Sequence, residues 1–330
     1  MTSSSSSSAA TARHVLVVGS VNADIVVELE RLPARGETVA ASKSDTGKFF
    51  PGGKGANQAA AAARLISDAT ALRTKFVCQF GNDTHAQALQ DALQQVGVDT
   101  ALAGYPACPS GQAFVFVYPD GENSIVIVGG ANAAWPQTLP SEMVGAIQSA
   151  AIVLLQCEIP AEINFMVAKT AAEAKVPVMW DSGGEDRKIP DQVLPFITYL
   201  CPNETELARL AGREVNTTDD AVTAARFMQA KGANAFLVTL GSQGSVYIPA
   251  NGNGDIIHQE CFKVDEVVDT TGAGDCFRGA FAVAIAEGKS VKESMQHAAA
   301  AGALCVQVAG AMPSMPSAAQ VVSFLASNTH

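Results

Sequence analysis

The chain has 330 residues, of which 48% are hydrophobic, so it can bury a sizeable core and is not expected to be globally disordered. Its formal net charge of −11 disfavours nucleic acids and acidic membranes as partners, because both carry charge of the same sign. Seven scattered cysteines without a Cys-x-x-Cys pair indicate reduced thiols and a cytoplasmic location, and argue against a structural zinc site. No apolar run approaches the ~18 residues that a membrane span requires.

Along the chain, short β-branched runs alternate with longer alanine-rich runs, which is the pattern of a parallel sheet covered by helices. The serine-rich residues 1–12 are predicted to be a disordered tail, with an organelle transit segment as the alternative, and residues 13–330 to form one α/β domain. The predicted strands are His14–Val18, Phe76–Phe80, Ile152–Gln156, Pro177–Asp181, Tyr199–Pro202, Ala235–Leu240 and, antiparallel, Ser245–Pro249. The predicted helices are Ala56–Ile66, His85–Val96, Ala161–Ala174, Glu204–Leu210, Asp219–Lys231, Ala273–Ala286 and Val291–Val308.

Two regions, residues 24–50 and 110–129, interrupt this alternation. The first contains two extended segments, Asp24–Glu30 and Thr38–Phe50, between the first strand and the first helix. The second contains a predicted hairpin, Gln112–Tyr118 and Ser124–Val128, around a Pro-Asp-Gly-Glu turn. We expect these strands to form a lid over the site, and an antiparallel extension of the main sheet is the alternative.

The most informative segment is Asp269–Phe277, with the sequence Asp-Thr-Thr-Gly-Ala-Gly-Asp-Cys-Phe. Gly272, Ala273 and Gly274 allow backbone N–H groups to approach a ligand closely, and a helix that starts there directs its positive end at an anion. Asp275 is predicted to lie in the first helical turn beside that anion. The arrangement suits phosphoryl transfer with a carboxylate base, although an ordinary strand-to-helix turn has a similar composition.

Two polar motifs follow the first strand and open the first helix. Asn22 and Asp24 stand two residues apart, so on an extended backbone both side chains point the same way and can bind adjacent hydroxyls. Residues 52–58, Gly-Gly-Lys-Gly-Ala-Asn-Gln, lack the ending of a P-loop but allow a polyol to approach the backbone. Turn chemistry and a solvated lysine are the alternatives.

Three further motifs lie at the ends of predicted strands. Glu158 follows a buried run, where a carboxylate needs a partner such as a sugar hydroxyl or a structural cation. Asn203 and Glu206 suit a helix capping box, and equally Mg²⁺ held largely through water. The small-residue loop Thr239–Gly244 suits a nucleotide and is also compatible with a plain turn.

Together these motifs resemble those of the ribokinase group in the PfkB family of sugar and nucleoside kinases. The resemblance runs from about Val15 to Pro316 and includes residues 19–24, 52–58, 202–206, 239–244 and 269–275. It implies a three-layer ribokinase-like α/β fold with a small β lid, and ATP-dependent phosphorylation of the C5 hydroxyl of ribose. A kinase for another sugar or nucleoside, or a non-catalytic sugar or nucleotide sensor, is the alternative. A nicotinamide dehydrogenase is disfavoured because no Gly-x-Gly-x-x-Gly follows the first strand.

The resemblance also implies roles for individual residues. Asp275 would be the general base, and Gly272, Ala273 and Gly274 would form the anion hole. The residues expected to bind the sugar are Asn22, Asp24, Gly53, Lys54, Gly55, Ala56, Asn57, Glu158 and Asp275. Mg²⁺ and phosphate would be organised by Asn203 and Glu206, and the nucleotide would be lined by Thr239, Leu240, Gly241, Ser242, Gln243, Gly244 and Gly274.

A monovalent cation, usually K⁺, is implied beside the anion hole, together with a homodimer formed through the lid strands. The positions that match its ligands are Asp269 and Ser314 by side chain, and Thr271, Cys305, Val308 and Gly310 by carbonyl. Three departures from the group leave nucleotide preference open. Asp181-Ser182-Gly183-Gly184 replaces an Asn-Pro-Ala type loop, Arg278 replaces a common Asn, and Ala299 replaces a His or Asn that is common near adenine.

Overall fold

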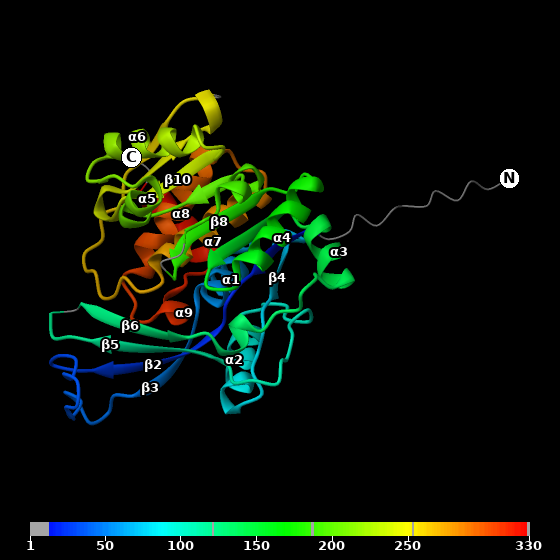
Figure 1. Ribbon diagram of the computed structural model, residues 1–330. Helices are drawn as coiled ribbons and strands as arrows, with labels where there is room; N and C mark the ends of the chain where they lie inside the picture. The colour runs from blue at the N-terminus through cyan, green and yellow to red at the C-terminus, as the bar shows by residue number, and fades with distance from the viewer. Residues whose placement is uncertain (1–12, 121, 186–187, 253, 329–330) are drawn as a thin grey trace.

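The structure, a computed structural model, describes residues 13–120, 122–185, 188–252 and 254–328. Within these residues, an eight-stranded sheet has the order β12-β11-β10-β9-β8-β7-β1-β4, and a separate four-stranded sheet has the order β3-β2-β5-β6. Figure 1 shows the smaller sheet projecting below the main body of the molecule. The tail predicted at residues 1–12 and the hairpin residue Gly121 lie outside the described residues.

The main sheet is parallel from β4 to β10 and antiparallel at β11 and β12, as the alternating runs predicted. Its strands are β1 (His14–Val18), β4 (Arg73–Val77), β7 (Ile152–Cys157), β8 (Val178–Gly184), β9 (Tyr199–Cys201), β10 (Ala235–Thr239), β11 (Ser245–Ile248) and β12 (Ile257–Gln259). The predicted strand Phe76–Phe80 is shifted, because β1 pairs with residues 73–77. Phe80 lies in the segment after β4, where it is buried and its backbone N–H donates to the carbonyl of Gly104. Its apolar side chain therefore reflects burial and not membership of the strand.

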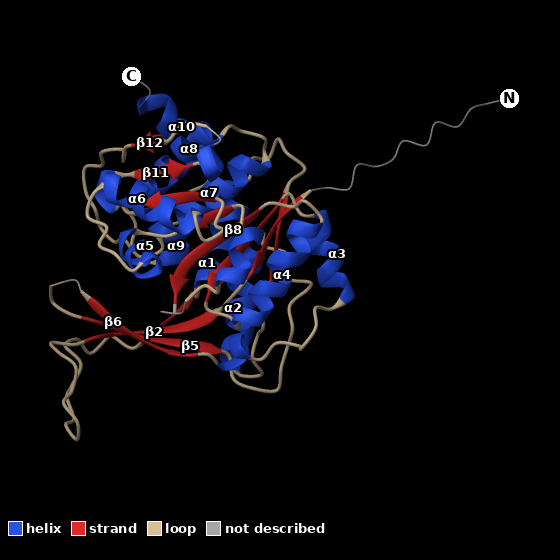
Figure 2. Ribbon diagram, turned by 45° about the horizontal axis from the view of Figure 1, so that its top comes forward, coloured by secondary structure: helices blue, strands red, loops and turns tan. Residues whose placement is uncertain are grey.

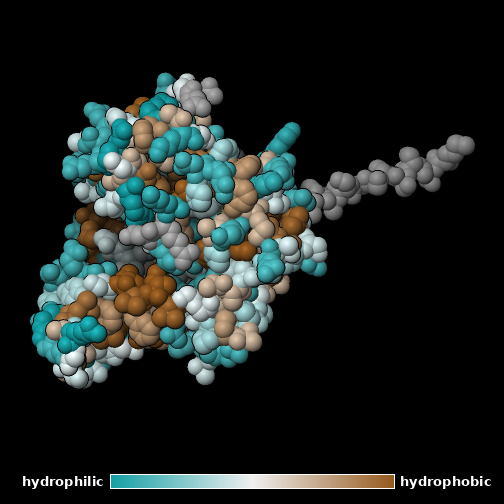
Figure 3. All heavy atoms as spheres, viewed as in Figure 1, coloured by the Kyte–Doolittle hydropathy of each residue, from teal (hydrophilic) through white to brown (hydrophobic). Residues whose placement is uncertain are grey.

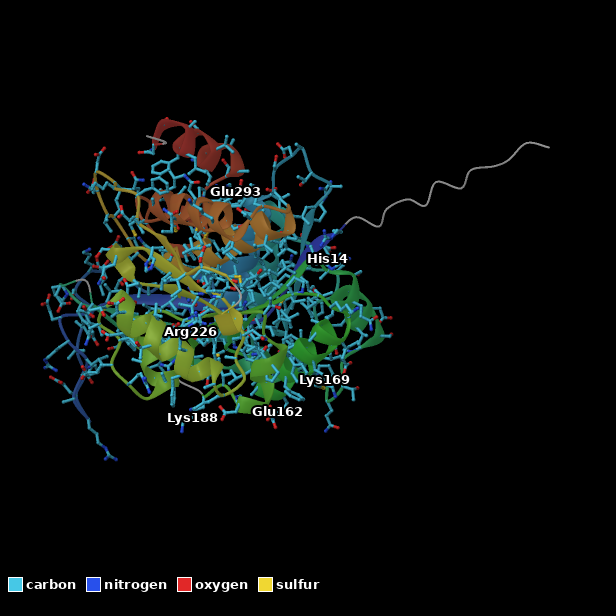
Figure 4. All side chains as sticks on the ribbon, turned by 90° about the horizontal axis from the view of Figure 1, so that it is seen from above. His14, Glu162, Lys169, Lys188, Arg226 and Glu293 are labelled. Atoms are coloured by element: carbon cyan, nitrogen blue, oxygen red, sulfur yellow. The ribbon has the colours of Figure 1, made fainter. Side chains whose placement is uncertain are left out.

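Helices cover both faces of the main sheet. One face is covered by α1 (Lys54–Leu65), α2 (Thr84–Gln95), α7 (Ala273–Ala286), α8 (Val291–Cys305), α9 (Ala311–Ser314) and α10 (Ala318–Asn328). The other is covered by α3 (Ser141–Ser149), α4 (Ala161–Glu173), α5 (Glu204–Ala211) and α6 (Thr218–Gln229). Seen from above in Figure 4, Glu293 of α8 lies on one side of the sheet, and Glu162, Lys169 and Arg226 lie on the other. Short 3-10 helices occur at Gly130–Ala133, Asp191–Phe196, Gly241–Gln243 and Ala250–Gly252.

Close packing of α1 on α7 fixes the two helix starts that carry the predicted catalytic motifs. Ala59 to Ala62 of α1 are fully buried. A Cβ at Gly279 of α7 would come within 2.7 Å of the Cβ of Ala61, so the two backbones approach closely only because both residues are small. Among the described residues, no helix combines the length and the apolarity needed to cross a membrane.

The four lid strands form a sheet of their own and do not extend the main sheet. They are β2 (Asn22–Glu28), β3 (Lys48–Gly52), β5 (Gly111–Val117) and β6 (Asn123–Val128). Figure 2 shows this sheet as a thin layer beside the helices and strands of the main body. Asp24 is opposite Ala113, which is opposite Ile127, so these side chains share one face of the lid. The alternate residues Phe114, Val126 and Val128 belong to the other face.

Candidate active site

A cavity of about 1020 Å³ lies between the lid and the main body. Figure 3 shows this region as a hollow above the hydrophobic side chains of the lid. The lid contributes Asn22, Asp24, Ala113, Val115, Ile125 and Ile127, and the main body contributes Gly53, Lys54, Asn57, Glu158, Thr271, Gly272 and Asp275. An apolar lid facing a few convergent polar groups is typical of a small-molecule site.

Asp275 lies at this cavity in the first turn of α7 and is 5% exposed. Asn57 Nδ2 donates to its Oδ2 at 3.0 Å, and Gln58 Nε2 donates to its Oδ1 at 3.0 Å. Lys54 Nζ lies 3.9 Å from Oδ1. Because both oxygens accept hydrogen bonds from donors of α1, the carboxylate is held in one orientation.

The start of α7 is shaped by glycines that exclude side chains. Gly272 has φ 78°, a left-handed conformation, and a Cβ there would lie 2.9 Å from Ala311 Cα. A Cβ at Gly274 would lie 2.6 Å from Arg278 Nη1. The first N–H groups of a helix have no intrahelical acceptor. That of Ala273 donates to the carbonyl of Thr270 at 3.1 Å, whereas those of Gly272 and Gly274, which carry no side chain, can be presented to an anion.

Asp24 is the acidic side chain that the lid brings to the cavity. Its Oδ1 is buried without a hydrogen-bond partner among the described residues. Burial, together with the nearby carboxylates of Glu158 and Asp275, raises the pKa of Asp24 to about 7. A buried acceptor that faces a cavity without a donor fits a ligand that supplies hydroxyl groups.

Asn22 and Glu158 are fixed in the same wall. Asn132 Nδ2 donates to Asn22 Oδ1 at 2.7 Å. Glu158 Oε2 accepts from Ser20 Oγ at 2.5 Å and from the backbone N–H of Lys54 at 2.9 Å. Burial raises the pKa of Glu158, while Lys54 and these hydrogen bonds oppose the rise. The structure therefore brings together the sugar-binding candidates from four separate segments.

Two of those candidates, Gly55 and Ala56, lie behind the cavity wall and do not line it. A Cβ at Gly55 would lie 2.6 Å from the backbone N of Ser20, and the N–H of Ala56 donates to the carbonyl of Ser20 at 2.9 Å. Ala56 is fully buried in the core. Both residues bring α1 close to the loop after β1, which is a packing role.

A buried charge cluster behind Asp275 was not predicted from the sequence as part of the site. Asp181, 1% exposed, accepts from Gln58 Nε2 at 2.8 Å and from the backbone N–H of Gly183 at 2.8 Å. Arg278 Nη2 lies 3.2 Å from its Oδ1, and Lys54 Nζ lies 3.6 Å from its Oδ2. Although burial acts to raise it, the two cations hold the pKa of Asp181 below its usual value. An acid at the end of a buried strand was the signal that could have identified it.

Arg278 also reaches the helix start that was predicted to organise Mg²⁺. It donates to the carbonyl of Cys201 from Nη2 at 2.7 Å, and its Nη2 lies 3.8 Å from Glu206 Oε2. Asn203 and Glu206 form the predicted capping box of α5, because Asn203 Oδ1 accepts from Glu206 N and Glu206 Oε2 accepts from Asn203 N. Ser182 Oγ donates to the same Glu206 oxygen at 3.1 Å.

The loop Thr239–Gly244 lies beside this capping box and outside the cavity lining described above. Thr239 N donates to the carbonyl of Pro202 at 3.1 Å, and residues 241–243 form a 3-10 turn. Gly244 has φ 89°, and a Cβ there would lie 2.1 Å from the carbonyl oxygen of Gln259. Glycine is therefore required for the loop to turn toward β11.

The residues proposed for the monovalent cation lie behind the start of α7. Asp269 Oδ1 accepts from Thr271 N at 2.9 Å, and its Oδ2 accepts from Gly310 N at 2.8 Å. Burial acts to raise the pKa of Asp269, but these hydrogen bonds hold it below its usual value. Ser314 Oγ donates to the carbonyl of Ala311 at 2.7 Å and lies 3.0 Å from Cys305 Sγ. Across the described residues, no cluster of three or more His, Cys, Asp or Glu side chains is arranged to hold a metal ion.

The sheet, the lid and the acidic cavity between them define a carbohydrate kinase. Residues 12–318 match the model of the pfkB family of carbohydrate kinases, and the chain belongs to this family. It is 46% identical over 316 residues to a ribokinase of Arabidopsis thaliana, covering 94% of this chain and 80% of that protein. It is 34% identical to a ribokinase of Haemophilus influenzae, covering 94% and 97% of the two chains.

Solved structures agree with this assignment. The structure of Arabidopsis thaliana ribokinase complexed with ribose and ATP has a TM-score of 0.88 and 46% identity, and the match covers 95% of this chain and 99% of that one. A ribokinase of Thermotoga maritima has a TM-score of 0.82 and 34% identity, with coverage of 94% and 99%.

Proposed function

We propose that this protein transfers a phosphoryl group from ATP to the C5 hydroxyl of D-ribose and forms ribose 5-phosphate. The observation that carries the proposal is the position of Asp275, which is held on both oxygens beside the glycines of a helix start and at a cavity lined by hydroxyl-binding groups. The ribokinase relatives, and the related structure complexed with ribose and ATP, support the same activity.

The chemistry follows from positioning and charge. Asp275 accepts the proton of the sugar hydroxyl, whose oxygen attacks the terminal phosphorus in line with the leaving oxygen of ADP. The N–H groups of Gly272 and Gly274 stabilise the negative charge on the transferred phosphoryl group. The N–H of Ala273 donates to the carbonyl of Thr270 at 3.1 Å and is not counted among them. No covalent bond to the protein forms, so the rate depends on how well hydroxyl, base and phosphate are aligned.

Ribose is recognised by fixed polar groups. Asn22, Asp24, Asn57 and Glu158 present amide and carboxylate groups to the sugar, with Gly53 and Lys54 at the opening of α1. The buried acceptors Asp24 Oδ1 and Asn57 Oδ1 have no donor among the described residues. Ribose hydroxyls would satisfy both, so an analogue that lacks the corresponding hydroxyl would leave a buried acceptor unpaired and bind less well.

The nucleotide side is assigned to the loop Thr239–Gly244 and to the start of α5. Mg²⁺, when bound, neutralises phosphate charge. Glu206 fits a role in holding it through water, because its Oε1 is not used by the capping box, whereas Asn203 Oδ1 already accepts from Glu206 N and Thr205 Oγ1. We therefore assign Asn203 to holding Glu206 in place.

A monovalent cation such as K⁺ fits the oxygen atoms behind the anion loop. Asp269 ties Thr271 to Gly310 while each of its oxygens keeps a further lone pair. Together with Ser314 and the carbonyls of Thr271, Cys305, Val308 and Gly310, it supplies carboxylate, hydroxyl and carbonyl oxygens, a donor set that suits K⁺. A bound cation would stabilise the conformation of the loop that precedes Gly272.

The lid offers a surface for a second copy of the chain. β6 is an edge strand, and Val126 and Val128, on the face turned away from the cavity, are 54% and 47% exposed. An exposed apolar edge strand favours pairing with another chain, so we assign a homodimer formed through the lids. All seven cysteines are free thiols, which supports a cytoplasmic location.

The proposal is tested by measuring ADP formation with purified protein across ribose, 2-deoxyribose, fructose, 2-keto-3-deoxygluconate and a nucleoside. We expect the highest kcat/KM with ribose and a 5-phosphate product by ³¹P NMR. Asp275→Asn should retain ribose binding and lose at least ~10²-fold in kcat, the scale of general base catalysis. Preference for a substrate without a free C5 hydroxymethyl group would overturn the assignment, and absence of ADP with every sugar would favour a sensor.

A further inference from the structure

Gln58 on α1 joins two carboxylates that belong to different parts of the fold. It is 1% exposed and lies behind Asn57, outside the cavity lining. Its Nε2 donates to Asp275 Oδ1 at 3.0 Å and to Asp181 Oδ2 at 2.8 Å. An amide nitrogen carries two hydrogens, so each carboxylate receives one of them.

The direction of this amide is fixed by a second glutamine. Gln156 at the end of β7 is fully buried, and its Nε2 donates to Gln58 Oε1 at 2.8 Å. Gln156 Oε1 has no hydrogen-bond partner among the described residues and packs against the loop after β1, where a Cβ on Gly19 would lie 2.0 Å from it. A reversed Gln58 amide would direct its oxygen at two carboxylates, so only one orientation is compatible with ionised neighbours.

The other groups that face Asp275 do not replace this contact. Asn57 binds the opposite oxygen, and Lys54 Nζ lies 3.9 Å away on a side chain that is 27% exposed. Arg278 is directed at Asp181, and Asp24 and Glu158 contribute further negative charge from the cavity wall. Gln58 is therefore the fully buried donor that holds Oδ1 and separates Asp275 from Asp181.

We propose that Gln58 is a positioning residue for the general base, with Gln156 setting the direction of its amide. The inference rests on the proposed function, in which Asp275 accepts the proton of the sugar hydroxyl. Gln58 keeps the carboxylate aimed at the cavity and offers it a donor on the side where a second buried carboxylate, Asp181, lies. Gln156 acts one contact further away and touches neither carboxylate in the described contacts.

The decisive variant is Gln58→Glu, which preserves shape and replaces the donor by a third carboxylate. We expect kcat at pH 7 to fall by about 10- to 10²-fold, since misalignment of a catalytic group costs this much. The acidic limb of the pH–kcat profile should move upward by about one pH unit or more, because like charges disfavour ionisation of Asp275. KM for ribose should change by less than about threefold, since Gln58 lies outside the cavity lining.

Gln156→Glu tests whether Gln156 sets the direction of the Gln58 amide. Its carboxylate would repel Gln58 Oε1, reverse that amide and shift the same pH limb without touching Asp275. Gln58→Met removes the donor without adding charge, so it should lower kcat and shift the acidic limb of the pH–kcat profile by less than Gln58→Glu does. It also provides a test if a charged variant fails to fold. Gln229→Glu is the matched control, because Gln229 is 5% exposed and donates to the carbonyls of Asn234 and Pro249 far from the site.

The outcomes separate the two proposals. A shifted pH limb in Gln58→Glu and Gln156→Glu, with the wild-type profile in Gln229→Glu, supports the positioning role. A wild-type profile and kcat in Gln58→Glu or Gln58→Met overturns it, while turnover of ribose by the wild type and its loss in Asp275→Asn leave the proposed function intact. A wild-type protein without sugar-dependent ADP formation overturns the proposed function and this inference with it.

Discussion

Arg278 and Asp181 form a buried ion pair, with Nη2 3.2 Å from Oδ1 and side chains that are only 4% and 1% exposed. The guanidinium also donates to the carbonyl of Cys201, so it links β8, β9 and α7 at one point. Because neither charge reaches solvent, each is compensated mainly by the other, with Lys54 at 3.6 Å from Asp181 and Glu206 at 3.8 Å from Arg278 as the further partners. The pair thus supports Gln58 and Asp275 from behind while it fills the space beside Gly274.

Replacing Arg278 by Met should destabilise the fold by about 3–5 kcal/mol, the cost of breaking a buried ion pair, because Asp181 would keep only the half-buried Lys54, at 3.6 Å, as a cationic partner. The measurement is the free energy of unfolding in urea. Arg226→Met serves as the control, since Arg226 is a partly buried arginine that bonds Gln229 and Pro249 away from the site, and it should cost about 1 kcal/mol. Adding Asp181→Asn to Arg278→Met should recover part of the loss. A cost below about 1 kcal/mol for Arg278→Met would show that the pair is solvated.

The titration of Asp24 should make sugar binding depend on pH. Burial, then Glu158 and Asp275, raise its pKa from 3.8 to about 7. A carboxylate accepts hydroxyl donors more strongly than a neutral acid does, so ribose affinity without ATP should increase as pH rises from 6 to 8. Calorimetry in buffers of different ionisation enthalpy at pH 7 should detect release of a proton on binding. Asp24→Asn should bind more weakly and without this pH dependence.

The raised pKa of Asp24 also makes the stability of the fold depend on pH. Between pH ~4 and ~7 the folded protein keeps a proton on Asp24 that the unfolded chain has released, so this group lowers stability as pH rises through that window. The difference in unfolding free energy between Asp24→Asn and wild type should therefore grow in favour of the variant over this range. A pH-independent difference would contradict the raised pKa of Asp24.

The sequence indicated several residues that the structure places at the cavity, because they lie in local motifs, and it missed contacts between residues far apart in the chain. Asp275 and Asn57 open helices and Glu158 follows β7, and parallel strands bring such ends to one edge of a sheet, whereas Asp24 reaches the cavity from the lid strand β2. Gln58 belongs to the glycine-rich motif of residues 52–58, yet its hydrogen bonds to Asp181 and Asp275 join residues that are 123 and 217 positions apart in the chain. No local pattern indicates which buried carboxylate an amide will meet.

The same limit applies to the fold. The helix predicted at Ala273–Ala286 has those bounds in the structure, because glycines precede a long apolar run. From the sequence, α3, α9, α10 and β12 were not predicted. α3 has nine residues and β12 has three, too few for a clear period, and α10 is stabilised largely by contacts with α8. Tertiary packing, and not local propensity, decides these elements.

The lid surface gives a prediction about assembly. Val126→Glu places a charge on the exposed apolar face of β6 and should convert a dimer to a monomer, as measured by light scattering coupled to size exclusion. Val322→Glu is the matched control, because Val322 is 61% exposed on α10, and it should leave the mass unchanged. A wild-type protein that is monomeric at micromolar concentration would refute the lid dimer.

Two helical glycines of the same layer should respond to alanine in opposite directions. A Cβ at Gly279 would lie 2.7 Å from Ala61 Cβ and 3.1 Å from the backbone N of Ala62, whereas a Cβ at Gly302 of α8 meets nothing within 4 Å. Gly279→Ala should cost about 1–3 kcal/mol through overpacking, and Gly302→Ala should gain about 0.5–1 kcal/mol in urea unfolding. Displacement of α7 from α1 would also move Asp275 relative to Asn57, so kcat should fall in Gly279→Ala alone. Adding Ala61→Gly should recover only part of both losses, because the contact with the α1 backbone at Ala62 remains.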